Sequence, residues 1–147
     1  MQTSIKTLST AETEAAGEAL ARELIGANKR RACIALYGEM GVGKTAFVRG
    51  FARAMGGTGV KSPTYTVVNE YKTSPVPIFH FDLYRIADGD ELYAIGFDDY
   101  LSRDGYALCE WSENIIPFIP DYAVTVTIVR TDEGGGREIT IKQPAKG

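Results

Sequence analysis

Several features are scarce or absent in this sequence. No apolar run approaches the ~20 residues that a membrane-spanning helix needs, and the first residues contain no apolar signal-peptide segment. There are two cysteines, Cys33 and Cys109, and both lie within apolar segments, so we expect buried free thiols rather than a disulfide or a zinc site. Together these absences favour a cytoplasmic protein without a membrane partner.

Positive charge is also in short supply. The 16 lysines and arginines are outnumbered by 19 aspartates and glutamates, which gives a net charge of −3. A broad basic face, the usual sign of a protein that grips nucleic acid, is therefore not expected, and DNA is not a predicted partner. The 147 residues, 44% of them hydrophobic and 24% charged, fit one globular domain spanning residues 1–147.

What the sequence does contain is a phosphate-binding motif at residues 38–45, Gly-Glu-Met-Gly-Val-Gly-Lys-Thr. Two glycines five residues apart are followed by Lys44 and Thr45, as in a P-loop. The apolar run before the motif, residues 32–37, predicts a buried strand, and residues 45–55 carry apolar side chains at helical spacing. The motif therefore lies where its function requires, between a strand and a helix N-terminus.

The residue types of this motif suit a triphosphate. Gly38, Gly41 and Gly43 let backbone N–H groups approach the phosphates, and the helix directs its positive end toward them. Lys44 is predicted to reach the β- and γ-phosphates, and Thr45 to place its hydroxyl on Mg²⁺. The predicted nucleotide-binding loop consists of Gly38, Glu39, Met40, Gly41, Val42, Gly43, Lys44, Thr45 and Ala46.

Two carboxylates are predicted to complete the site, because ligands bind at the carboxyl ends of the parallel strands of an open sheet. Glu110 ends an apolar segment, as a Walker-B acid does, and Asp82 lies toward the end of a segment that begins at Ile78. Either carboxylate could hold Mg²⁺ or orient the attacking water. We favour Glu110 with Thr45 on the metal and Asp82 nearer the γ-phosphate, so that Lys44, Asp82 and Glu110 are the predicted catalytic residues.

Three other side chains leave alternatives open. Thr64 lies between the P-loop helix and the next strand, like the switch threonine of GTPases, so its hydroxyl is a candidate sensor of γ-phosphate and Mg²⁺. His80 is either structural, which we favour, or a base, and Trp111 either packs in the core or covers the site. The sequence has no Asn-Lys-x-Asp guanine signature, which favours ATP over GTP.

The remaining segments predict an α/β fold. Residues 2–8 predict a short edge strand, and a capping box at residues 9–12 opens a helix that runs to about residue 26. The other expected elements are strands at 66–72, 77–85 and 106–111, helical segments at 88–96 and 97–102, an irregular connection around Pro117 and Pro120, and a hairpin of 123–130 with 137–142. We expect a single P-loop NTPase domain whose mixed β-sheet has a parallel nucleotide-binding centre, a C-terminal antiparallel hairpin and helices on both faces.

Four blocks of sequence go beyond these general patterns. They are the P-loop, Lys-Ser-Pro-Thr-Tyr-Thr at residues 61–66, His-Phe-Asp-Leu-Tyr-Arg at 80–85 and Glu-Trp at 110–111. In order and spacing they resemble the bacterial TsaE family, also called YjeE, over essentially the whole chain. The second and third blocks are far more specific than the P-loop. Departures are small: Glu39 stands where many members have Asp, and Val42 where Ala is common.

The resemblance implies an ATPase of the tRNA threonylcarbamoyladenosine (t6A) pathway that uses ATP and Mg²⁺. Its partners would be the TsaD and TsaB proteins, whose complex modifies adenosine 37 and would be reset by the ATP cycle, so tRNA is expected to be involved only indirectly. By position, Thr45 and Glu110 match the Mg²⁺ site, and Asp82 matches an acid needed for hydrolysis. Thr13 and Arg137 match positions near the nucleotide, whereas the residues alone predict both at the surface.

Two other functions also fit a P-loop: a small kinase with a separate phosphate acceptor, and a nucleotide-binding interaction module with negligible turnover. Such kinases usually carry a lid with several arginines, but residues 88–103, the one lid-sized insertion, are acidic and contain only Arg103. We therefore favour the ATPase. Its intrinsic rate should be low and stimulated by a partner, because no cis arginine finger is evident and Arg85 is only a weak candidate.

Overall fold

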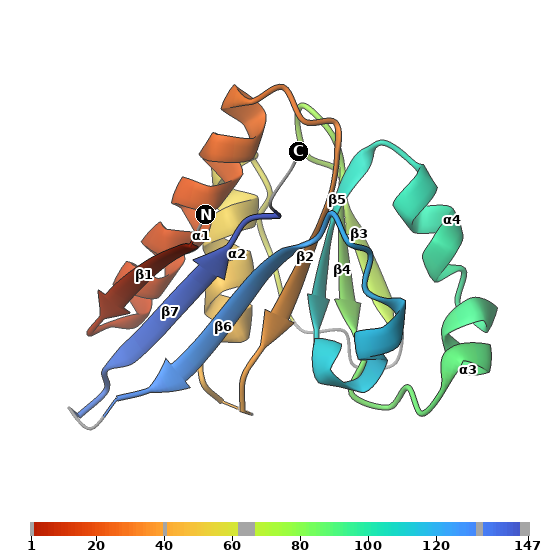
Figure 1. Cartoon of the computed structure of the whole chain (residues 1–147). Helices are drawn as coiled ribbons and strands as arrows, with labels where there is room; N and C mark the ends of the chain where they lie inside the picture. The colour runs from red at the N-terminus through yellow and green to blue at the C-terminus, as the bar shows by residue number, and fades with distance from the viewer. Residues whose placement is uncertain (1, 40, 62–66, 132–133, 145–147) are drawn as a thin grey trace.

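The computed structural model describes residues 2–39, 41–61, 67–131 and 134–144, so the predictions for Met40 and Thr64 lie outside the described residues. The described strands form one seven-stranded sheet with the order β1-β7-β6-β2-β5-β4-β3 (Figure 1). Parallel and antiparallel pairs both occur, and helices pack against the sheet. The predicted α/β fold with a mixed sheet is therefore confirmed.

The centre of the sheet is parallel, as predicted. Strand β2 (Arg31–Tyr37) pairs in parallel with β5 (Gly105–Glu110) on one side and with β6 (Val124–Arg130) on the other, and β4 (Ile78–Asp82) pairs in parallel with β5. All six residues of β5 are buried, because the sheet is covered on both faces here, which explains its continuous apolar run. The parallel pairing brings the carboxyl ends of β4 and β5 together, with Asp82 directly opposite Glu110.

Antiparallel strands flank this centre. Strand β7 (Arg137–Lys142) returns along β6 as the predicted hairpin, and β1 (Gln2–Thr7) pairs with β7 as the predicted edge strand. At the opposite edge, β3 (Val68–Tyr71) pairs with β4. Strand β4 ends three residues earlier than expected, because the Tyr84 N–H turns back to donate to Asp82 Oδ1 at 3.1 Å.

Helices cover both faces, as predicted. Helices α1 (Thr10–Gly26) and α2 (Lys44–Ala54) pack together on one face, over a core that includes Ile78 and Leu108 (Figure 1). The alternate residues Phe79 and Phe81 point to the other face, where they meet α3 (Gly89–Ala94) and α4 (Phe97–Ser102). The connection that was expected to be irregular contains a 3₁₀ helix, η1 (Ser112–Phe118). Among the described residues, no helix is both long enough and apolar enough to span a bilayer.

Candidate functional site

The P-loop joins the end of β2 to the start of α2, and its glycines are required by its backbone. Gly38, Gly41 and Gly43 have φ values of 146°, 76° and 112°, a region that side chains disfavour. At Gly38 a Cβ atom would also lie 2.6 Å from the carbonyl oxygen of Ile128 on β6. The loop therefore runs against the hairpin while its amide groups stay close to the N-terminus of α2, an arrangement suited to phosphate.

Lys44 is the first residue of α2, and its side chain folds back over the loop. Its Nζ atom donates to the Gly38 carbonyl at 2.6 Å and lies 3.8 Å from the centre of the Trp111 ring. The residue is only 4% exposed. Burial lowers the pKa of Lys44, and the carboxylates of Glu113 and Glu110 oppose this shift. The ammonium is thus held at the loop by a carbonyl, an aromatic face and nearby negative charge.

The predicted metal ligands lie side by side. The Thr45 hydroxyl, one residue into α2, is 3.3 Å and 3.4 Å from the two carboxylate oxygens of Glu110 at the end of β5. Asp82 ends the neighbouring strand, directly opposite Glu110 in the ladder. Segments about 65 residues apart in sequence therefore meet at one edge of the sheet, because P-loop and strand ends point the same way.

A cleft of about 390 Å³ joins these groups. It is lined by Gly41, Gly43, Lys44, Thr45, Ala46, Asp82, Tyr84, Glu110 and Trp111. A hydroxyl beside one buried carboxylate supplies hard oxygen ligands, and Mg²⁺ takes such a partial set because substrate phosphates and water complete its shell. The residues present therefore fit Mg²⁺ bound together with a nucleotide.

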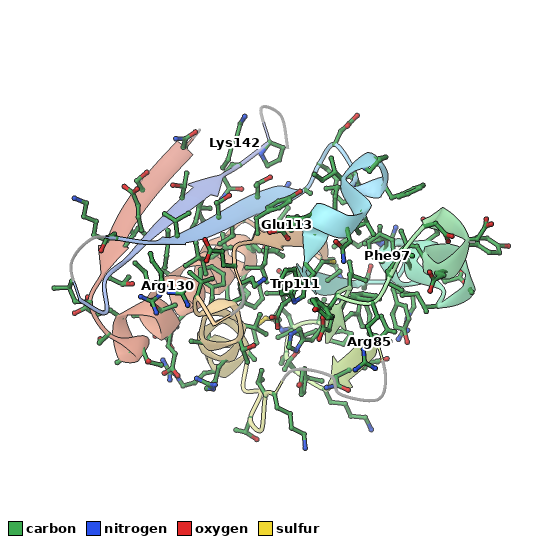
Figure 2. All side chains as sticks on the ribbon, turned by 90° about the horizontal axis from the view of Figure 1, so that it is seen from below. Arg85, Phe97, Trp111, Glu113, Arg130 and Lys142 are labelled. Carbon is green, nitrogen blue, oxygen red and sulfur yellow. The ribbon has the colours of Figure 1, made fainter. Side chains whose placement is uncertain are left out.

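Trp111 separates this cleft from a second hollow of about 360 Å³ on the hairpin side of the loop. Figure 2 shows Trp111 near the middle of the molecule, with Glu113 beside it, Arg130 toward the hairpin and Phe97 toward α4. Trp111, which has a positive φ of 64°, lines the cleft and is also partly buried against the core beneath α3 and α4. It therefore both borders the cleft and belongs to the core. Both alternatives for this residue therefore hold in part.

Glu113 is a site residue that the sequence prediction missed. Its Oε2 atom accepts the Gly38 N–H at 2.9 Å and so ties η1 to the first residue of the P-loop. The signal in the sequence was slight: an acid three residues after Glu110, in a segment expected to be irregular. Only the turn into η1 brings it back to the loop.

Thr13 and Arg137 both contact the P-loop. Thr13 is 3% exposed, its hydroxyl is 3.0 Å from that of Thr7, and its Cγ2 lies 3.6 Å from where a Cβ on Gly43 would be. The sequence alone predicted Thr13 at the surface, and this prediction is wrong. Arg137 Nε donates to the Val42 carbonyl at 2.8 Å, so the hairpin braces the loop from the other side. Whether either residue touches nucleotide stays a prediction.

His80 lies behind the predicted metal ligands. It is completely buried on β4, and its Nε2 atom is 2.5 Å from Glu110 Oε2. A general base must reach the attacking water, so full burial favours the structural alternative over the catalytic one. The loop, the strand-end acids and the cleft together define a P-loop protein of the nucleotide-binding class.

Comparison with known proteins narrows this class. A family model described as "Threonylcarbamoyl adenosine biosynthesis protein TsaE" matches residues 8–139, and the chain belongs to that family. The chain is 43% identical over 105 residues to the tRNA threonylcarbamoyladenosine biosynthesis protein TsaE of Haemophilus influenzae, covering 71% of this chain and 66% of that protein. Its counterpart in Bacillus subtilis is 38% identical over 108 residues, covering 73% of this chain and 66% of the relative.

A solved structure shares the fold. The crystal structure of Bacillus subtilis YdiB superposes with a TM-score of 0.80 at 28% identity, covering 99% of this chain and 87% of that one. The resemblance inferred from the four sequence blocks is thus confirmed at the level of family and fold. The alignments with the two curated relatives span slightly less than two thirds of each relative's length.

Proposed function

We propose that this protein is the ATP-binding and ATP-hydrolysing component of the machinery that forms t6A at position 37 of tRNA, acting in the cytoplasm on a complex of TsaD and TsaB. The observation that carries the proposal is the meeting of Thr45 and Glu110 at 3.3 Å, in one cleft with Lys44 and Asp82. The names of the relatives, tRNA threonylcarbamoyladenosine biosynthesis proteins, supply the pathway.

In this proposal each cleft residue has a distinct task. The loop amides and Lys44 bind the β- and γ-phosphates of ATP, since the buried ammonium is already aimed at the loop. Thr45 and Glu110 hold Mg²⁺, which when bound neutralises charge on the phosphates. Asp82 is half-buried at the mouth of the same cleft and orients the attacking water toward the γ-phosphate.

The cleft also accounts for the expected low intrinsic rate. None of the described residues that line it is an arginine, so this part of the chain offers no guanidinium to the charge that develops on the transferred phosphoryl group. An arginine supplied by a partner is worth ~10³–10⁵ in rate in GTPases. We therefore propose that the TsaD–TsaB pair stimulates hydrolysis, either by supplying a cation or by ordering the site.

Steady-state ATP hydrolysis tests this function. The purified chain is assayed alone and with TsaD and TsaB from the same organism, alongside Lys44→Ala and, as a matched control, Lys72→Ala at an exposed lysine beyond β3. We expect a low rate that rises with the pair in the wild type and the control but stays at background in Lys44→Ala. Nucleotide binding without any rise would favour the interaction module, and phosphate transfer to an added acceptor would favour the kinase.

A further inference from the structure

The feature that the proposed mechanism leaves unused is the fully buried His80. It lies on β4 opposite Leu108 of β5, so that Glu110, two residues further along β5, is its diagonal neighbour on the same face of the sheet. Its Nε2 atom is 2.5 Å from Glu110 Oε2, while Thr45 Oγ1 lies 3.3 Å from that same oxygen. Glu110 is itself only 5% exposed. Strand and helix therefore hold one buried carboxylate from two sides.

The hydrogen bond to Glu110 determines which ring nitrogen of His80 is the donor. An ionised carboxylate only accepts hydrogen bonds, so Nε2 must carry the proton that it donates to Glu110. The other ring nitrogen, Nδ1, is buried and has no hydrogen-bond partner among the residues that the structure describes. The imidazole ring is therefore joined to the described residues by one hydrogen bond, which Nε2 donates to Glu110.

We propose that His80 is a positioning residue that fixes the Glu110 carboxylate for Mg²⁺, an inference that rests on the proposed function. With its Oε2 atom held by the imidazole N–H, the carboxylate cannot rotate freely about its last side-chain bond. Its other oxygen, Oε1, lies 3.4 Å from the Thr45 hydroxyl, the second predicted ligand. Partners of this kind behind a metal ligand are commonly worth 10–100-fold in metal affinity.

A purely structural histidine is the competing explanation, and two substitutions separate them. His80→Leu replaces the imidazole with an apolar side chain of similar size and so removes the Nε2–H donor. His80→Gln instead places an amide N–H at nearly the reach of Nε2. Both are compared with wild type for the Mg²⁺ concentration that half-saturates ADP binding, read from the emission of Trp111, the single tryptophan, which borders the cleft. Affinity for ADP in EDTA and the unfolding temperature are measured in parallel.

We expect His80→Leu to raise the required Mg²⁺ concentration about 10–100-fold while ADP affinity in EDTA changes less than about 2-fold, and His80→Gln to recover most of the loss. Equal Mg²⁺ dependence in His80→Leu and wild type would overturn the inference alone. So would a parallel loss of Mg²⁺-free ADP affinity in both variants, because that pattern follows from general disruption. A wild type whose ADP binding ignores Mg²⁺ would overturn the proposed metal site as well.

The imidazole also gives a readout that needs no ligand. His80 is the only histidine, so ¹⁵N spectra of the untagged chain report this ring without ambiguity. We expect a protonated Nε2 in the free protein, and a shift of the Nε2 signal when ADP and Mg²⁺ are added. A ring protonated at Nδ1 instead would contradict the hydrogen bond to Glu110, and with it the positioning role.

Discussion

The ammonium group of Lys44 has two neighbours that a bound nucleotide would replace. It donates to the Gly38 carbonyl at 2.6 Å and lies 3.8 Å above Trp111. Charged donors gain more from phosphate oxygens than from a neutral carbonyl, so nucleotide is expected to draw the ammonium off the indole. A single side-chain movement would then be visible in the emission of the single tryptophan.

Lys44→Ala should therefore weaken ADP binding by at least about 100-fold, since it removes about two hydrogen bonds to charged groups at ~1.5–3 kcal/mol each. The measurement is a nucleotide titration followed by Trp111 emission and checked by calorimetry. Lys72→Ala, at an exposed lysine, serves as the control and should titrate like the wild type. An unchanged affinity in Lys44→Ala would show that this lysine does not bind phosphate.

Among individual side chains, the sequence predicted those whose chemistry is tied to a motif or a strand end. Lys44, Thr45 and Glu110 are recognisable by type and order, and the structure brings them into one cleft. The contacts of Glu113 with Gly38 and of His80 with Glu110 could not be predicted in the same way. They depend on a turn back to Gly38 and on a diagonal register between β4 and β5, neither of which leaves a local pattern.

Helices α1 and α2 approach each other closely enough for their backbones to touch at two glycines. A Cβ atom on Gly17 would lie 2.1 Å from the Phe47 carbonyl oxygen, and one on Gly50 would lie 1.8 Å from the Glu14 carbonyl oxygen. Each glycine therefore lets its helix rest directly on the backbone of the other. The contact also sets where Thr13, in the first turn of α1, meets the P-loop at the start of α2.

Gly50→Ala should lower the free energy of unfolding by about 2–3 kcal/mol, because the added methyl meets backbone that can yield only if the helices separate. Urea denaturation gives this difference, and ADP affinity should fall with it because α2 carries Lys44 and Thr45. Gly26→Ala is the matched control, since a Cβ there meets nothing within 4 Å, and its stability should stay level or rise slightly. Similar stabilities for the two variants would refute the close crossing.

The same two helices are joined at their surface by Glu14, which bonds Arg49 at 2.8 Å and Arg53 at 2.9 Å. Hydrogen bonds from these arginines lower the pKa of Glu14 below its ordinary 4.5. A carboxylate with a lowered pKa in the folded state adds stability above pH 4.5, and this stability is lost as the pH falls through the folded-state value.

Glu14→Gln should thus cost about 0.5–1 kcal/mol at pH 7, a modest amount because both arginines are about half exposed and water screens the pair. The difference from wild type should shrink below pH 4.5 and in high salt. Glu23→Gln provides the control, because Glu23 is exposed on the same helix and has no ion pair among the described residues. A cost that does not depend on pH would rule out the charge as its source.

Elements with local signals were predicted well. The capping box at the start of α1 forms, with Ser9 Oγ accepting the Glu12 N–H at 3.1 Å and Glu12 accepting the Leu8 N–H at 2.9 Å. The hairpin and the edge strand were also predicted correctly. The end of β4 and the helix η1 were not, because an aspartate turn and a tertiary contact, rather than side-chain periodicity, decide where those segments bend.

The cleft is formed and supported by segments from the first part, the middle and the last part of the sequence. Residues of α2, the ends of β4 and β5, and Trp111 line it, while α1 and β7 brace the loop through Thr13 and Arg137. A ligand in this cleft contacts elements that separate when the chain unfolds. Binding to the folded state alone must therefore raise the stability of the entire fold.

ADP with Mg²⁺ at 100 times its dissociation constant should add about 2.7 kcal/mol to the free energy of unfolding. In a chain of this size that corresponds to a rise of about 5–10 °C in the unfolding temperature. Differential scanning calorimetry measures it, and EDTA should remove the part of the rise that depends on Thr45 and Glu110 holding the metal. Lys44→Ala should show little rise at the same ligand concentration, while Lys72→Ala should match the wild type. An equal rise in all of these proteins, with or without EDTA, would mean that ADP binds elsewhere, because only the cleft offers the buried ammonium and the paired hydroxyl and carboxylate within the described residues.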